Sequence, residues 1–144
     1  MSVAASRTTR ARGVSPFFEW LRIGGRNMGV PQASVTDIGK VLAAAKARLA
    51  VDLRGVHGIR HWTRVRENGH RLARRTGANK EVVELFAFVH DCCRENDRYD
   101  LGHGERAAEF AVPLRGTLIR LPDDAFALLH EAIRITRRDT PGRM

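Results

Sequence analysis

The sequence predicts an all-α protein, a compact bundle of about five helices. Apolar residues recur at helical spacing in successive segments, and short turns containing glycine or proline separate these segments. No segment alternates apolar and polar residues convincingly, as a half-buried β-strand would. The chain has 144 residues, 43% of them hydrophobic and 28% charged, which suits one globular domain with a hydrophobic core.

The chain divides into three predicted parts. Residues 1–33 contain several arginines and the turn-forming stretch "GGRNMGVPQ", so we expect a flexible, basic N-terminal segment. Residues 34–138 hold all the predicted helices and form the expected domain. Residues 139–144, "DTPGRM", are expected to fray.

The first two long helices have recognisable ends. The first is expected to begin at Ser34 or Thr36 and to run to about Leu53, before the glycines of "RGVHG" break it. The second is expected over residues 59–76, with Gly77 as the glycine that ends it. Two stripes run along this second helix. The stripe expected to face the core is His61, Val65, Asn68 and Leu72, and the mainly basic stripe beside it is Arg60, Arg64, Glu67, Arg71 and Arg75.

Three more helices are expected in the second half of the chain. One starts near Asn79 and delivers His90 and Asp91 at its C-terminal end. A short alanine-rich helix is expected over residues 104–112. The last is expected over residues 123–138, and its predicted buried residues are Phe126, Leu129 and Ile133.

The net charge of +9 and the isoelectric point near 11.1 raise the hypothesis of a nucleic-acid partner. Only three of the 25 basic residues are lysine, a bias that a GC-rich genome can also produce. No aromatic residues interleave with the arginines to form a stacking platform for bases. Nucleic acid is therefore a disfavoured partner.

Membrane and extracellular locations are also disfavoured. No apolar run approaches the roughly 18–20 residues that a membrane-spanning helix needs, and the N-terminus does not resemble a secretory signal. The two cysteines, Cys92 and Cys93, are adjacent and poorly placed to bridge each other. A reducing cytoplasm is the expected location.

Histidines at the ends of apolar helix faces predict a metal site. His61 heads the face of one helix, and the consecutive pair His90–Asp91 ends another. Two such faces must meet in the core of a small bundle. Imidazole nitrogens and a carboxylate that converge there suit a divalent cation, which would also offset the cost of burying Asp91.

The ordered motifs "HGIRHWTRV", "LFAFVHDCCREND" and "HGERAAEFA" resemble the HD-domain superfamily of metal-dependent phosphohydrolases. The resemblance covers residues 51–133 and is similar to an uncharacterised subset with an HGxxHWxRV start. It implies hydrolysis of a nucleotide or another small phosphate ester with a divalent metal: Mn, Fe, Ni, Zn or Mg. The implied metal ligands are His61, His90, Asp91 and, for a second metal or the substrate phosphate, His103.

The same resemblance implies further roles. Asp91 would also orient the attacking water, and His57, one helical turn before His61, is similar to the general acid of cyclic-nucleotide phosphodiesterases. Those enzymes have Asn where Gly58 stands, so His57 is alternatively a helix-entry or solvent-exposed residue. Arg94 is expected either to clamp the substrate phosphate or to pair with an acidic residue of the following loop, Asp97 or Asp100.

The sequence departs from the family pattern near its end. The family completes its ligand set with a late Asp, and the related subset has a histidine where Ile135 or Thr136 stands here. Asp139 is the only late Asp, and it lies in the predicted tail. The chain therefore resembles a C-terminally truncated member whose catalysis is impaired.

Three hypotheses follow. The first is an HD-type phosphohydrolase. The second is a degenerate, non-catalytic HD fold that acts as a binding protein, with the last helix as a homodimer surface. The third, and least favoured, is a basic nucleic-acid-binding module.

Overall fold

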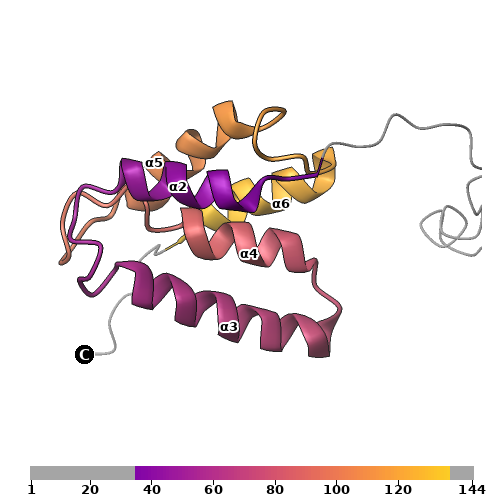
Figure 1. Ribbon diagram of the computed structural model, residues 1–144, viewed down its shortest axis with the longest axis horizontal. Coiled ribbons are helices and arrows are strands. Elements are labelled where there is room, and N and C mark those ends of the chain that lie inside the picture. Colours follow the sequence, from indigo (N-terminus) through magenta and orange to yellow (C-terminus); the bar gives the residue numbers. More distant parts are fainter. Residues whose placement is uncertain (1–34, 137–144) are drawn as a thin grey trace, which may run out of the picture. The chain divides into compact units, whose positions relative to one another are not determined.

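The computed structural model describes residues 35–136. In this range five α-helices and one 3-10 helix follow one another without a β-strand, which confirms the predicted all-α class (Figure 1). The helices are α2 (Ile38–Arg48), α3 (Ile59–Thr76), α4 (Lys80–Val89), α5 (His103–Ala111), η1 (Val112–Leu114) and α6 (Asp123–Arg134). The predicted segments 1–33 and 139–144 lie outside the described residues.

Helix α4 is the centre of the bundle. Helices α2, α3, α5 and α6 all pack against it, and Figure 1 shows it lying between α3 on one side and α2 and α6 on the other. Its side chains Leu85 and Val89 are fully buried. The core continues into α2 through Val41 and Ala45 and into α6 through Ile133. The end of α4 therefore lies where several helices meet.

Local signals set the turn between α3 and α4 as predicted. Gly77 adopts a left-handed conformation with φ of 76°, and its N–H donates to the carbonyl of Ala73. Asn79 then caps α4, because its side-chain oxygen accepts from the N–H groups of Glu81 and Val82 at 2.9 and 3.2 Å. A three-residue connection thus makes the two helices antiparallel neighbours.

Helix α2 ends at Arg48, five residues earlier than predicted. The next ten residues wind into turns, in which the Ile59 N–H donates to the Leu53 carbonyl at 2.8 Å. This turn requires Gly58, since a Cβ there would lie 1.9 Å from the Leu53 carbonyl oxygen. Helix α6 begins at Asp123 as predicted but ends at Arg134, four residues before the predicted end, and its Phe126, Leu129 and Ile133 are buried as predicted.

The predicted inward face of α3 is wrong. The buried residues of this helix are Trp62 and Ala73, whereas Asn68 is exposed and Leu72 is 60% exposed. Helix α3 packs mainly on α4, and only the stripe that faces α4 is covered. The face that carries Leu72 borders an open groove instead.

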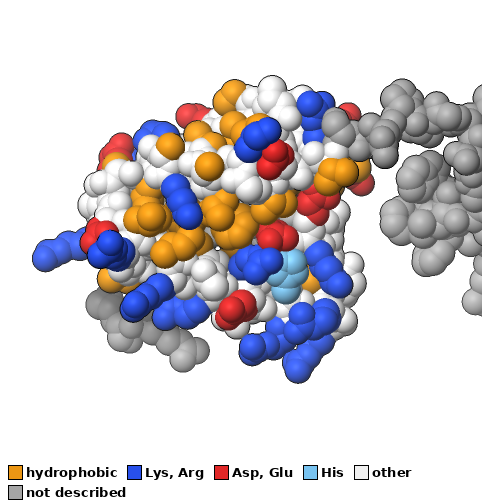
Figure 2. Space-filling view, viewed as in Figure 1, with side chains coloured by type: hydrophobic (Ala, Val, Ile, Leu, Met, Phe, Trp, Pro, Cys, Tyr) orange, Lys and Arg blue, Asp and Glu red, His pale blue; other side chains and the backbone are white. Residues whose placement is uncertain are grey.

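Charged and apolar side chains separate on the surface. Figure 2 shows Lys and Arg side chains gathered over α3 and a band of hydrophobic side chains along α4 and α2. Arginines of the predicted basic stripe, Arg60, Arg64, Arg71 and Arg75, are exposed.

Among residues 35–136, no helix is both long enough and apolar enough to cross a bilayer. Cys92 and Cys93 are buried free thiols with their Sγ atoms 3.7 Å apart.

Candidate metal centre

Three side chains from two helices converge at the C-terminal end of α4. His61 comes from the first turn of α3, and His90 and Asp91 follow the last turn of α4. The His61 Nε2 lies 3.2 Å from the His90 Nε2 and 3.2 Å from the Asp91 Oδ2. The His90 Nε2 lies 3.3 Å from the same oxygen. These atoms form a nearly equilateral triangle, and within the described residues they are a group that can hold a metal ion.

The dimensions of this triangle fit a small divalent cation. Metal–nitrogen and metal–oxygen bonds of roughly 2.0–2.1 Å at tetrahedral angles separate neighbouring ligand atoms by about 3.3 Å. The three measured separations of 3.2, 3.2 and 3.3 Å match that value. Two imidazoles and one carboxylate also suit Zn, Fe, Mn or Ni by ligand type. The residues therefore fit a divalent metal in both spacing and chemistry.

Backbone carbonyls orient the His90 ring. Its Nδ1 lies 3.0 Å from the Phe86 carbonyl oxygen and 3.1 Å from that of Ala87, both in the last turn of α4. A carbonyl oxygen can only accept a hydrogen bond, so Nδ1 carries the hydrogen. In neutral His90 the Nε2 lone pair then points at the cluster. This is the arrangement of a histidine positioned for metal binding.

The cluster contains more acceptors than hydrogens. Burial lowers the pKa of His61, and the adjacent His90 lowers it further, so His61 is neutral near pH 7. A neutral His61 supplies at most one N–H to the triangle, and the Asp91 carboxylate supplies none. A divalent cation bound by these three atoms would satisfy the lone pairs that this hydrogen leaves unpaired.

The second oxygen of Asp91 has its own partners. The His103 Nε2 lies 3.2 Å from Oδ1, and the Arg94 Nη1 lies 3.4 Å from it. Burial opposes ionisation of Asp91, but the interactions with His103, His90 and Arg94, in that order, outweigh this, and the pKa of Asp91 lies well below its usual range. Asp91 is therefore an ionised carboxylate in a fixed orientation, with Oδ2 directed at the two histidines.

His103 lies outside the triangle. Its Nε2 faces Asp91 and its Nδ1 faces the Asp100 carbonyl oxygen, and the side chain is only 1% exposed. The hydrogen bond to Asp91 raises the pKa of His103, burial opposes this, and the Asp100 carbonyl raises it further. His103, whose two ring nitrogens face Asp91 and the Asp100 carbonyl, holds Asp91 in place. Its predicted role as a ligand to a second metal stays a prediction.

Arg94 braces the loop after α4. Besides its contact with Asp91, it donates to the carbonyl oxygens of Asn96 at 3.3 Å and Arg98 at 3.1 Å. The alternative expectation for Arg94 was an ion pair with Asp97 or Asp100. The structure shows its ion pair with Asp91 instead. Arg94 borders the same pocket as the triangle. Its role as a phosphate clamp stays a prediction.

His57 lies at the rim of this pocket. Its ring centroid is 5.9 Å from that of His61, and its Nδ1 lies 3.2 Å from the Asp97 Oδ1. Asp97 thereby orients the His57 ring through Nδ1, and Nε2 is the ring nitrogen that does not contact Asp97. The one-turn spacing of His57 and His61 predicted their proximity, but no local signal identified Asp97, which is 40 residues away in sequence. The general-acid role of His57 stays a prediction.

Thr136, two residues after the end of α6, completes the rim of this pocket. The pocket has a volume of about 290 Å³, and Thr136 borders it together with the histidines, Asp91 and Arg94. Its hydroxyl donates to the Ala132 carbonyl at 3.0 Å. This is one of the two positions at which the family resemblance predicts a histidine. A hydroxyl therefore lies on the side of the pocket where the resemblance expects a further ligand.

The two perturbed histidines predict opposite pH slopes of stability without metal. The pKa of His103 is raised in the folded state, so its contribution is full below about 6.5, the unfolded value, and is lost as the pH rises through the folded pKa. The pKa of His61 is lowered, so its contribution is present above about 6.5 and is lost as the pH falls through its folded pKa. We expect maximal stability near pH 6.5, measured by urea unfolding with a chelator present. His103→Gln should flatten the alkaline slope alone, and an unchanged slope would contradict the assignment.

The fold and the cluster together define the class: an all-α protein with a candidate divalent-metal centre between α3 and α4. Comparisons with protein-family models, curated proteins and solved structures found no match to this chain. The HD-domain resemblance therefore rests on the sequence motifs.

Proposed function

We propose that this protein is a metal-dependent phosphohydrolase of the HD type, which hydrolyses a nucleotide or another small phosphate ester. The observation that carries the proposal is the triangle of His61, His90 and Asp91, whose three ligand atoms lie 3.2–3.3 Å apart. These three residues would hold the metal. When bound, a divalent cation lowers the pKa of water and offsets negative charge on phosphoryl oxygens.

The surrounding residues support this proposal chemically. Asp91 is ionised, and its Oδ1 accepts from His103 and Arg94, so its other oxygen is held in position for a cation. Arg94 is a permanent cation at the pocket wall, where it would attract the phosphate. His57, held by Asp97 at the rim, would donate a proton to the leaving oxygen.

One observation favours a second candidate, a non-catalytic HD fold. Asp91 already has two buried cationic or hydrogen-bonding partners, His103 and Arg94, so part of its desolvation cost is offset without a metal. The ligand set also contains three protein atoms, with Thr136 on the remaining side of the pocket. In this case the cluster would stabilise the fold and would not hydrolyse esters.

Metal analysis combined with a phosphatase assay separates the two candidates. Protein purified without chelators should contain about one divalent ion per chain and should hydrolyse simple phosphate monoesters, with activity restored by Mn, Fe, Ni, Zn or Mg after chelation. His61→Ala should lower metal affinity by at least about 100-fold, because it removes one of three ligands. His61 is 28% exposed, so this truncation should be tolerated by the fold.

His130→Ala is the matched control, since His130 lies on α6 and does not border the pocket of the cluster. It should leave both metal content and hydrolysis unchanged. Metal only in traces, with no hydrolysis by the reconstituted protein, would refute the proposed activity and favour the non-catalytic candidate. Stoichiometric metal without hydrolysis of any phosphate ester would refute the activity while leaving the metal centre standing.

A further inference from the structure

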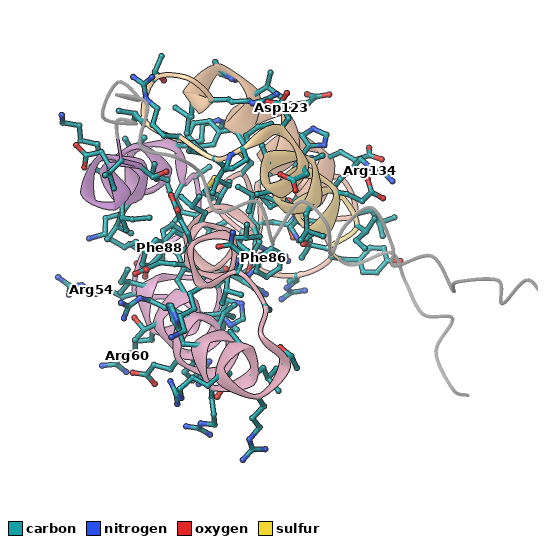
Figure 3. All side chains as sticks on the ribbon, turned by 90° about the vertical axis from the view of Figure 1, so that its right-hand side faces the viewer. Arg54, Arg60, Phe86, Phe88, Asp123 and Arg134 are labelled. Atoms are coloured by element: carbon teal, nitrogen blue, oxygen red, sulfur yellow. The ribbon has the colours of Figure 1, made fainter. Side chains whose placement is uncertain are left out.

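An apolar groove opens beside the candidate metal centre. It lies between α3 and α6, both of which pack on α4, and has a volume of about 450 Å³. Apolar side chains from all three helices border it, among them Val65 and Leu72 of α3, Val83 and Phe86 of α4, and Ala132 of α6. In Figure 3, Phe86 and Phe88 lie on opposite sides of α4, with Phe86 on the side toward α6.

The glycine of α3 shapes this groove. A Cβ at Gly69 would lie 2.5 Å from the Val83 Cγ1, so the missing side chain lets α3 approach α4 closely at this point. Leu72, one turn further on, remains 60% exposed. Leu72 lies beside Val83 and Phe86, which are half-buried, so the groove leaves apolar surface uncovered.

The groove and the metal pocket adjoin each other. On α3, Val65 borders both, one turn after His61. On α4, Phe86 borders the groove one turn before His90, and their rings stack with centroids 4.9 Å apart and planes 14° apart. Ala132 on α6 borders the groove, and Thr136, one turn later, borders the pocket. Residues of α3, of the end of α4 and of the last turn of α6 or just after it therefore border both cavities, with ionisable side chains at the metal pocket and apolar side chains in the groove.

We propose that this groove binds the apolar part of the substrate, so that the substrate is an amphipathic phosphate ester with an alkyl or aryl group. This inference rests on the proposed phosphohydrolase function and narrows its substrate class. The pocket of the candidate metal centre takes the phosphate, and the adjoining apolar groove takes the ester group. A volume of about 450 Å³ lies within the usual range for one small-molecule site, roughly 300–1,000 Å³.

A series of n-alkyl phosphates from ethyl to decyl tests this inference on the metal-reconstituted chain. The value of kcat/KM should rise about two- to fourfold per added methylene until the groove is filled, because each buried methylene favours binding. Leu72 lies about 16 Å along α3 from His61, so only long chains reach it. Leu72→Gln should therefore lower kcat/KM for decyl phosphate several-fold and leave ethyl phosphate unchanged.

Leu128→Gln is the matched control. Leu128 on α6 is 61% exposed, close to the 60% of Leu72, but does not border the groove. It should leave the whole chain-length series unchanged. Hydrolysis that is independent of chain length, or equal losses in the two glutamine variants, would overturn the groove assignment while leaving the phosphohydrolase proposal standing.

Binding of non-hydrolysable n-alkylphosphonates, measured by calorimetry, separates the two proposals. Tighter binding of longer chains, weakened several-fold by Leu72→Gln for decylphosphonate, supports the groove assignment even if no ester is hydrolysed. Binding that does not depend on chain length overturns it. A dimer in light scattering that Leu72→Gln converts to monomers would also overturn it, because a second copy would then occupy the groove.

Discussion

Replacing Asp91 with asparagine should abolish metal binding and lower the free energy of unfolding by about 3–5 kcal/mol. The amide removes the negative charge that faces both His61 and His90. It also leaves Arg94, 2% exposed, and His103, 1% exposed, without their shared counter-ion. A buried charge that loses its partner is among the most destabilising single changes in a protein. Urea unfolding of the metal-free protein measures the stability change, and calorimetric titration with Zn or Mn measures binding.

Asp97→Asn is the control for this change. Asp97 is more exposed and contacts His57 at the rim, so its loss should cost no more than about 0.5 kcal/mol and should leave metal affinity intact. If Asp91→Asn binds metal as the wild type does, the triangle is not the metal centre. If its stability is unchanged, Asp91 does not offset the buried charges of Arg94 and His103.

Replacing Gly58 with alanine should destabilise the protein by about 3 kcal/mol and impair the site. The new Cβ would lie 1.9 Å from the Leu53 carbonyl oxygen and 2.4 Å from its carbon, and backbone atoms cannot yield as a flexible side chain does. Gly58 also precedes the first turn of α3, between His57 and His61. A displaced helix start should therefore weaken metal binding as well. Thermal unfolding with and without added metal measures both effects.

Gly39→Ala is the matched substitution in α2. A Cβ at Gly39 would meet only the Asp37 Oδ1, at 3.6 Å, within ordinary contact distance. Alanine is favoured over glycine inside a helix, so this variant should gain about 0.5–1 kcal/mol. A Gly58→Ala protein as stable as wild type would show that the turn before α3 does not require close backbone approach.

The candidate metal centre and the apolar groove require different features of the fold. The cluster needs positions held to a fraction of an ångström, and it lies at the end of α4, which every other α-helix of the described chain packs against. The groove needs an open apolar surface, and it lies where α3 and α6 each pack on α4. The central helix thus accounts for both: its end holds His90 and Asp91, and its exposed side carries Phe86.

Much of the site was predictable because its signals are local. Gly77 and Asn79 end α3 and begin α4 through their own backbone and side-chain hydrogen bonds, which depend on neighbouring residues alone. The pair His90–Asp91 follows an apolar helical run, so its place at the end of a core helix was predictable. Its approach to His61 was also predicted, but the α3 face on which that prediction relied is buried only in part, with Asn68 and Leu72 exposed.

The sequence alone determined the helical class, the main turns and the residues of the candidate metal centre, because capping and periodicity act over a few residues. Only the tertiary structure decided that Trp62 is buried in α3 while Leu72 is exposed, that Asp97 holds His57, and that Arg94 pairs with Asp91. Those outcomes depend on which helices pack against each face. For the same reason, the groove became visible only once α3 and α6 had been placed on either side of α4.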